Sequence, residues 1–154
     1  MSSEIERRFL LDGLPPDLPA GTRLRQGYLA IDGEVTLRVR DAGGDMTLTV
    51  KGGSGLERVE VERPLDADEF EALWELSRGR RIDKVRSVVD LGPHSAEVDV
   101  YGADLEGLAT VEVEFSSQDD AGGFEPPGWF GEEVTGRPEW GNAALSVHGR
   151  PPGG

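Results

Sequence analysis

The stretch Glu4-Ile5-Glu6-Arg7-Arg8 has the character of a β-strand and carries charged residues two positions apart. In a β-strand, side chains two residues apart point to the same face, so Glu4, Glu6 and Arg8 share one face. The same spacing of charged residues recurs in later stretches that have the composition of strands. These doublets are Arg38 and Arg40, Lys84 and Arg86, Glu97 and Asp99, and Glu112 and Glu114. The sequence therefore predicts a set of strands that gather charges of both signs on one common surface.

Eight strands are expected, at residues 3–11, 23–31, 34–40, 45–51, 57–63, 82–90, 95–101 and 110–115. Asp32-Gly33 is a two-residue hairpin signal between the second and third strands. A helix is predicted over 66–78, where Asp66 and Glu69 form a capping box, and a shorter helix over 142–147. This strand spacing is typical of an antiparallel barrel.

The predicted fold class is mainly β with α (α+β), a closed eight-stranded antiparallel β-barrel with flanking helices. We expect one domain over residues 1–148, followed by a disordered tail at 149–154.

The composition excludes several classes of function. The net charge is −14 over 154 residues, which argues against generic binding to nucleic acid or to an anionic membrane. The chain has no cysteine, so thiolate nucleophiles and Cys-ligated zinc are excluded. No apolar run approaches the roughly 18 residues of a transmembrane helix. We therefore expect a cytoplasmic protein with no nucleic-acid or membrane partner, and a homodimer is left open.

The aligned faces hold carboxylates and cations in nearly equal numbers. The carboxylates are Glu4, Glu6, Glu60, Glu62, Glu97, Asp99, Glu112 and Glu114, and the cations are Arg8, Arg38, Arg40, Lys51, Arg58, Lys84 and Arg86. One interpretation is a half-buried sheet whose charged face meets water. The same-sign doublets favour an enclosed lumen instead, because like charges on one strand repel unless a counter-ion or a facing strand compensates them. Such a lumen suits a polyanion bound with magnesium or manganese, because both metals prefer carboxylate oxygens.

The chain resembles the CYTH superfamily, the triphosphate tunnel metalloenzymes, over nearly its whole length up to about Val147. The family's opening motif, E-x-E-x-K, stands here as Glu4-Ile5-Glu6-Arg7-Arg8. The further matches follow in order: 26–29, Arg38-Val39-Arg40, Lys51, 58–62, Lys84-Val85-Arg86, Glu97-Val98-Asp99, 105–108, Glu112-Val113-Glu114 and 129–135. The resemblance implies metal-dependent hydrolysis of a small-molecule triphosphate, foremost inorganic tripolyphosphate, inside the barrel.

The resemblance also implies a role for each matching residue. The substrate-binding cations are Arg38, Arg40, Lys51, Arg58, Lys84 and Arg86. The catalytic residues are Glu4, Glu6 and Arg8. The metal ligands are Glu4, Glu6, Glu60, Glu62, Asp99, Glu112 and Glu114.

The opening motif departs from the family pattern at one position. Arg8 replaces the lysine of the opening motif, so a planar, always-protonated guanidinium stands where the family has an ammonium.

The family also contains thiamine triphosphatases and class IV adenylyl cyclases. A non-catalytic module that binds polyphosphate or an organic phosphate is the alternative from another class. Its hallmark would be an intact set of cations with damaged carboxylates, whereas both Glu pairs are intact here.

Overall fold

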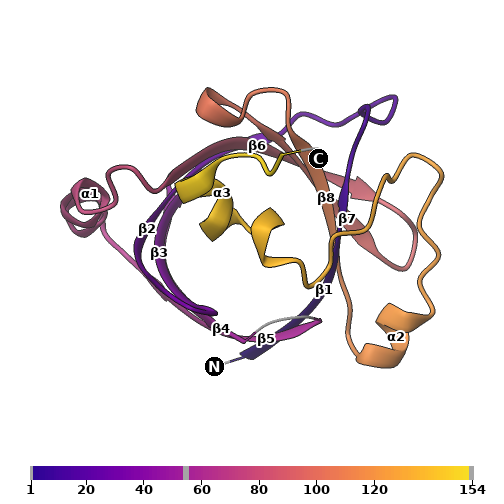
Figure 1. The fold of residues 1–154 in the computed structure, drawn as a ribbon, viewed down its shortest axis with the longest axis horizontal. Helices are drawn as coiled ribbons and strands as arrows, with labels where there is room; N and C mark the ends of the chain where they lie inside the picture. Colours follow the sequence, from indigo (N-terminus) through magenta and orange to yellow (C-terminus); the bar gives the residue numbers. More distant parts are fainter. Residues whose placement is uncertain (1, 54–55, 153–154) are drawn as a thin grey trace.

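Eight antiparallel strands form the body of the protein in a computed structural model that describes residues 2–53 and 56–152. The strands are β1 (Ser2–Leu10), β2 (Thr22–Asp32), β3 (Val35–Ala42), β4 (Asp45–Gly52), β5 (Glu57–Pro64), β6 (Arg81–Asp90), β7 (Ser95–Tyr101) and β8 (Ala109–Glu114). They close into a barrel in the order β1-β5-β4-β3-β2-β6-β7-β8 (Figure 1). The predicted fold class is confirmed.

Helices lie outside the barrel wall and at one end of it. The α-helices are α1 (Ala67–Glu75), α2 (Gln118–Gly122) and α3 (Asn142–His148), and the 3-10 helices are η1 (Ala103–Leu105) and η2 (Pro138–Trp140). Helix α1 begins with the predicted capping box, in which the Asp66 side chain accepts from the Glu69 backbone N–H and the Glu69 side chain accepts in return. Figure 1 shows α1 beside β2 and β3 and α2 on the opposite outer side.

Two apolar cores hold these elements together. One lies outside the wall, where the outward side chains of β1, β7 and β8, such as Phe9, Val98 and Val113, pack against Ala121 of α2. The other lies at the end of the barrel, where Tyr28, Ile82 and Tyr101 meet Trp140 and Leu145 of the C-terminal segment. The buried apolar side chains lie mainly in these two regions. The side chains that point into the barrel between them are therefore mostly polar.

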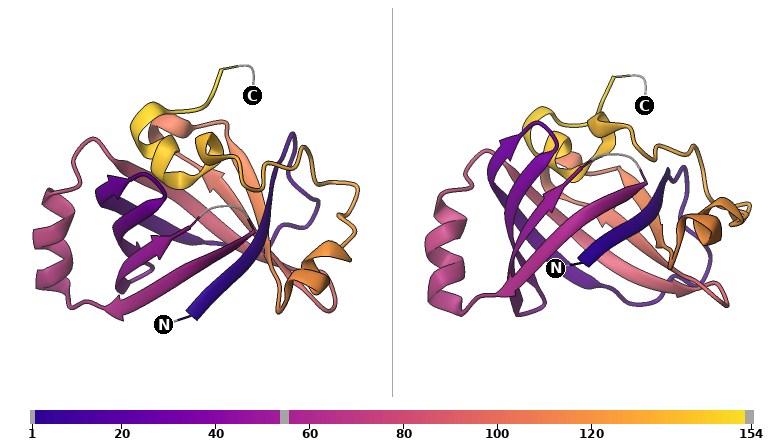
Figure 2. Two further views of the ribbon diagram at one scale, coloured as in Figure 1. Left: turned by 60° about the horizontal axis from the view of Figure 1, so that its bottom comes forward. Right: turned by 90° about the horizontal axis from the view of Figure 1, so that it is seen from below.

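The C-terminal segment closes one end of the barrel. Figure 2 shows α3 and the residues before it lying over one opening of the strands. Trp140 is 2% exposed and anchors this segment in the end core. The short helix predicted over 142–147 is therefore confirmed as α3, and it forms a cap, a name we use for residues 134–148.

Strand β1 forms a seam in the barrel. It pairs with β5 only through Ser2 to Ile5, and from Glu6 onward it pairs with β8. Beyond Glu6, the edge of β1 that faced β5 is covered by residues 131–134. One of the bonds is from the Val134 N–H to the Arg8 carbonyl, at 2.8 Å. The backbone of the C-terminal segment thus completes the wall where β5 has diverged.

The structure differs from the sequence prediction at some element boundaries. The hairpin between β2 and β3 turns at Gly33-Glu34 and not at Asp32-Gly33. The reason is that Gly33 has a φ of 58°, which suits the first position of a type II′ turn, so Asp32 stays in its strand. Helix α2 was not predicted.

The predicted tail at 149–154 is described only in part. Residues 149–152 contain no helix or strand, and residues 153 and 154 lie outside the described residues. Within the described chain, no helix combines the length and the apolar character that crossing a membrane requires.

Candidate functional site: a charged lumen

The barrel encloses a cavity of about 550 Å³ that is lined mainly by charged side chains. Alternation along the strands brings most of the predicted site residues to this lining. The predicted residues found there are Glu4, Glu6, Arg8, Arg38, Arg40, Lys51, Arg58, Glu60, Glu62, Arg86, Glu97, Glu112 and Glu114. The enclosed lumen, and not a charged face open to water, is therefore the correct interpretation of the charge pattern.

Two predicted residues do not line the cavity. Lys84 is 1% exposed and Asp99 is 0% exposed, and they lie behind the lining, where their side chains pair at 2.8 Å. Asp99 also accepts two hydrogen bonds from the Arg86 guanidinium, at 2.8 and 2.9 Å. Both side chains point inward as alternation requires, but at their depth in the barrel they are covered by neighbouring side chains.

One side of the lumen neutralises its own charges. We call this side the paired wall: Arg8, Lys84, Arg86, Asp99 and Glu112, which come from β1, β6, β7 and β8. Arg8 donates to Glu112 and Arg86 donates to Asp99, so each buried carboxylate has a cationic partner. Burial alone would raise the pKa of Glu112, but Arg8 and Arg86 hold it well below its usual range.

The pKa of Lys84 is likewise set by two opposing effects, burial and an ion pair. Burial lowers its pKa to about 8, and Asp99 opposes that shift by stabilising the charged form. The ion pair therefore compensates only part of the cost of burying this ammonium.

The opposite side of the lumen lacks such pairing. We call it the open wall: Arg38 and Arg40 of β3, with Thr47 and Thr49 of β4. Arg38 lies opposite Thr49 in the sheet and Arg40 lies opposite Thr47. Among the described residues, Nε of each arginine and Oγ1 of each threonine are buried without a hydrogen-bond partner. Burial, together with the positive charges of Arg38 and Arg86, lowers the pKa of Arg40.

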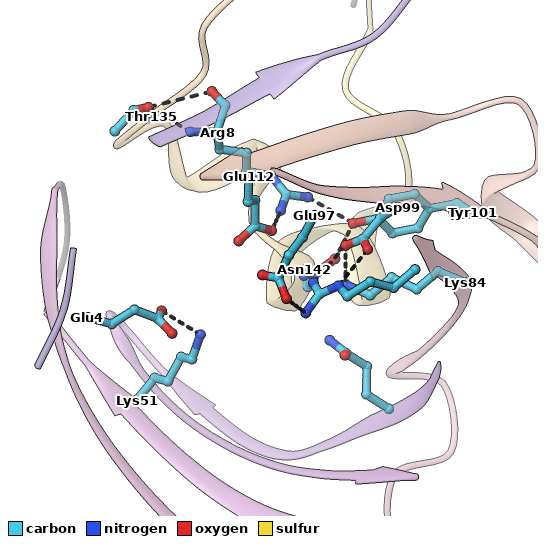
Figure 3. Close-up of polar contacts among 12 residues, drawn as sticks. Glu4, Arg8, Lys51, Lys84, Glu97, Asp99, Tyr101, Glu112, Thr135 and Asn142 are labelled. Atoms are coloured by element: carbon cyan, nitrogen blue, oxygen red, sulfur yellow. Dashed lines mark hydrogen bonds and ion pairs between the residues drawn. The ribbon is translucent and has the colours of Figure 1, made fainter. Parts of the chain in front are cut away.

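Carboxylates from β1, β5 and β8 crowd between the two walls. Lys51 of β4 contacts Glu4 at 2.8 Å and Glu60 at 3.5 Å, and Figure 3 shows the Glu4–Lys51 pair apart from the cluster around Arg8. Burial would raise the pKa of Glu4, but Lys51 brings it below its ordinary value. Burial and the nearby Glu112 raise the pKa of Glu6 well above its ordinary value. Like charges are therefore incompletely compensated in this region.

The residues that the structure describes do not form a ready-made metal cage. Within residues 2–53 and 56–152, no group of three or more Asp, Glu and His side chains converges closely enough to hold an ion. Several of the carboxylates are instead turned toward cations, as Glu4 is toward Lys51 and Glu112 toward Arg8. The mutual repulsion around Glu6 is nevertheless the electrostatic setting that a divalent cation relieves.

Sequence reasoning missed the contribution of the cap. The lining of the cavity includes Thr135, Asn142, Ala143 and His148, all from the C-terminal segment. Tyr101 was missed as well, although it continues the period-two series of Glu97 and Asp99 and its hydroxyl contacts Arg8 at 2.8 Å. The alternation along β7 could have identified Tyr101, whereas no local pattern connects the cap to the barrel.

Comparison with known proteins gives a consistent family. No family model matches the chain. An inorganic triphosphatase of Nitrosomonas europaea is 42% identical over 147 residues, which cover 94% of this chain and 97% of that protein. An inorganic triphosphatase of Acetivibrio thermocellus is 35% identical over 148 residues, which cover 94% of each protein.

Solved structures agree with these sequence matches. A crystal structure of an inorganic triphosphatase superposes with a TM-score of 0.71 at 40% identity, covering 96% of each chain. A putative adenylyl cyclase from Hippeastrum shares 17% identity with a TM-score of 0.54, over 80% of this chain and 83% of that one. At that level of identity the likeness concerns the fold alone.

Proposed function

The chain belongs to the family of inorganic triphosphatases, and we propose that it hydrolyses inorganic tripolyphosphate to pyrophosphate and phosphate in its lumen. We also propose that it is a member of the CYTH superfamily of triphosphate tunnel metalloenzymes. The open wall is the observation that carries the proposal. A cavity that buries guanidinium donors and hydroxyls without partners is prepared for an anion with many acceptor oxygens.

The cations of the lumen have distinct parts in substrate binding. Arg38 and Arg40 have free donors and would bind phosphate oxygens directly. Arg58 lies beside the loop that contains Gly53, and its Nε donates to the Gly53 carbonyl at 3.0 Å. Arg86 and Lys51 already have carboxylate partners and would share them with the substrate. Lys84 would act from behind the lining by holding Asp99 and so fixing Arg86.

We propose magnesium or manganese as the cofactor, with two ions per site. The ligands would be Glu4, Glu6, Glu112 and Glu114, supported by Glu60 and Glu62. We leave Asp99 out of this ligand set because Lys84 and Arg86 already occupy its oxygens. When bound, such ions neutralise charge on the phosphate oxygens.

The protein's own groups then supply positioning. Glu4 and Glu6 would orient the attacking water toward the terminal phosphorus, and the arginines would stabilise the charge that develops on the phosphate oxygens. Phosphoryl transfer needs little else from the protein, so the proposal assigns no side chain the role of a covalent nucleophile.

The lining also bears on which triphosphate is the substrate. Among the described lining residues, the rings are the phenol of Tyr28, which is 3% exposed, and the imidazole of His148. An adenine or thiazolium ring would therefore find only that imidazole on which to stack. This favours inorganic tripolyphosphate over ATP or thiamine triphosphate. The expected cytoplasmic location and homodimer stay predictions.

The test is phosphate release from tripolyphosphate, with thiamine triphosphate and ATP as parallel substrates, in magnesium, in manganese and in EDTA. We expect metal-dependent release from tripolyphosphate and little from the other two substrates. Tight binding of tripolyphosphate by calorimetry without any release would contradict the proposal and support the binding module. Glu4→Gln is expected to abolish release and keep binding, whereas Glu71→Gln on exposed α1 is the matched control.

A further inference from the structure

Arg8 is held on two sides by different partners. One Nη of its guanidinium donates to Glu112, and the other donates to the hydroxyl of Tyr101 at 2.8 Å. The Tyr101 hydroxyl in turn donates to Oδ1 of Asn142, the first residue of α3, at 2.5 Å. Figure 3 shows these side chains in one continuous chain from β1 to the cap.

The hydrogen-bond inventory of Tyr101 fixes the direction of this chain. A phenolic hydroxyl carries one hydrogen, and a guanidinium only donates. With Arg8 donating to the oxygen, the single hydrogen of Tyr101 must go to an acceptor, and Asn142 Oδ1 provides it. Tyr101 is 3% exposed and does not line the cavity, so water and substrate do not compete for its hydroxyl.

A guanidinium suits this position because its donors sit on separate nitrogens. Arg8 can therefore hold Glu112 and Tyr101 at the same time, whereas an ammonium offers one nitrogen for both. The backbone of Arg8 is tied to the cap as well, since its N–H donates to Thr135 Oγ1 at 2.9 Å and its carbonyl accepts from Val134 at 2.8 Å. The position of Arg8 thus depends on residues of the cap.

We propose that Asn142 is a positioning residue which, through Tyr101, fixes the Arg8 guanidinium for the reaction in the lumen. This inference rests on the proposed function in that Arg8 is taken to act on the substrate. It assigns the cap a part in catalysis beyond closing the end of the barrel, because loss of Asn142 removes the acceptor that orients the Tyr101 hydroxyl toward Arg8.

The experiment is a double-mutant cycle with Tyr101→Phe, Asn142→Ala and the two together. Each single variant is expected to lower kcat for tripolyphosphate about tenfold, because a small misplacement of a reacting group is costly, while KM stays within about twofold. The double variant is expected to be no slower than the singles, since both substitutions break the same chain. Multiplicative losses would overturn the proposal, because Asn142 would then contact the substrate independently of Tyr101.

Two further measurements separate positioning from mere stability. Ser146→Ala removes a hydroxyl that bonds the Ala143 carbonyl within the same helix, and it is expected to leave kcat unchanged. In an Arg8→Lys background, Asn142→Ala is expected to change kcat by less than about twofold, because a lysine held by Glu112 no longer depends on Tyr101. An undiminished tenfold loss in that background would contradict the chain.

The contacts are also tested without turnover. Denaturation midpoints of the same four proteins should be non-additive if Tyr101 and Asn142 are bonded in solution, and additive midpoints would contradict the bond. If the wild-type protein released no phosphate from any triphosphate, the proposed function would fail, while this denaturation cycle would still decide whether the chain of contacts exists.

Discussion

The paired wall and the open wall use buried arginines in opposite ways. In the paired wall, every buried charge has a partner of the other sign, and Asp99 holds two cations at once. In the open wall, Arg38 and Arg40 are brought next to threonines whose hydroxyls also lack partners. An unpaired buried donor costs stability, so its presence indicates a surface shaped for a ligand and not for the folded state alone. The difference separates the cations that are held in ion pairs from Arg38 and Arg40, which have none within the part of the chain that the structure describes.

The largest expected effect comes from breaking the paired wall. Asp99→Ala leaves Lys84 and Arg86 without their shared partner, and we expect it to lower the free energy of unfolding by about 3–5 kcal/mol. Chemical denaturation measures this loss. Adding Lys84→Met to that variant should restore part of it, because one uncompensated buried cation is removed. A loss below about 1 kcal/mol for Asp99→Ala would mean that the paired wall does not stabilise the fold.

A substitution in the open wall should have the opposite profile. Arg40→Ala is expected to lower kcat/KM for tripolyphosphate about 100-fold, because a donor directed at the phosphates is lost. Its free energy of unfolding should fall by no more than about 1 kcal/mol, since Arg40 has no hydrogen bond or ion pair among the described residues to lose. Steady-state kinetics and denaturation of one sample check both statements. Arg63→Ala, on the exposed outer face of β5, is the control and should change neither quantity.

Glu6, one of the carboxylates between the two walls, is expected to have a smaller effect on stability than Asp99. Burial and Glu112 raise the pKa of Glu6 above 4.5, so the folded protein keeps a proton here that the unfolded chain releases. Stability is therefore lost as the pH rises from the pKa of Glu6 in the unfolded chain through its pKa in the folded protein.

Glu6→Gln should raise the free energy of unfolding by about 1–2 kcal/mol at about pH 8 and have little effect at about pH 4. Thermal denaturation across this range checks it, and an equal gain at both pH values would contradict the raised pKa. Phosphate release should be lost in the same variant.

Much of this lumen could be predicted from local sequence because side-chain direction in a strand repeats every two residues. Glu4, Glu6 and Arg8 were placed correctly on that basis, as were Arg38 and Arg40. The roles assigned to these residues stay predictions until the variants are measured.

Depth in the barrel could not be predicted in the same way. Lys84 and Asp99 obey the alternation as well as Arg86 does, yet they lie behind the lining. Their depth depends on how far neighbouring strands are offset along the barrel, which is set by pairing between distant strands and not by the pattern within one. The contact between Tyr101 and Asn142 joins positions 41 residues apart, for which no periodic signal exists.

The seam at β1 has a consequence for the synthesis of the protein. A ribosome makes β1 first, but the residues that cover its second edge emerge much later, since Arg8 and Thr135 are 127 positions apart. Until then the strand has an open edge, which is the feature through which unfinished chains pair with one another. A nascent chain stopped before residue 131 would therefore hold all eight strands of the barrel and still be a candidate for aggregation. Closure of this seam is expected to be a late and slow step, because contacts between distant positions form slowly.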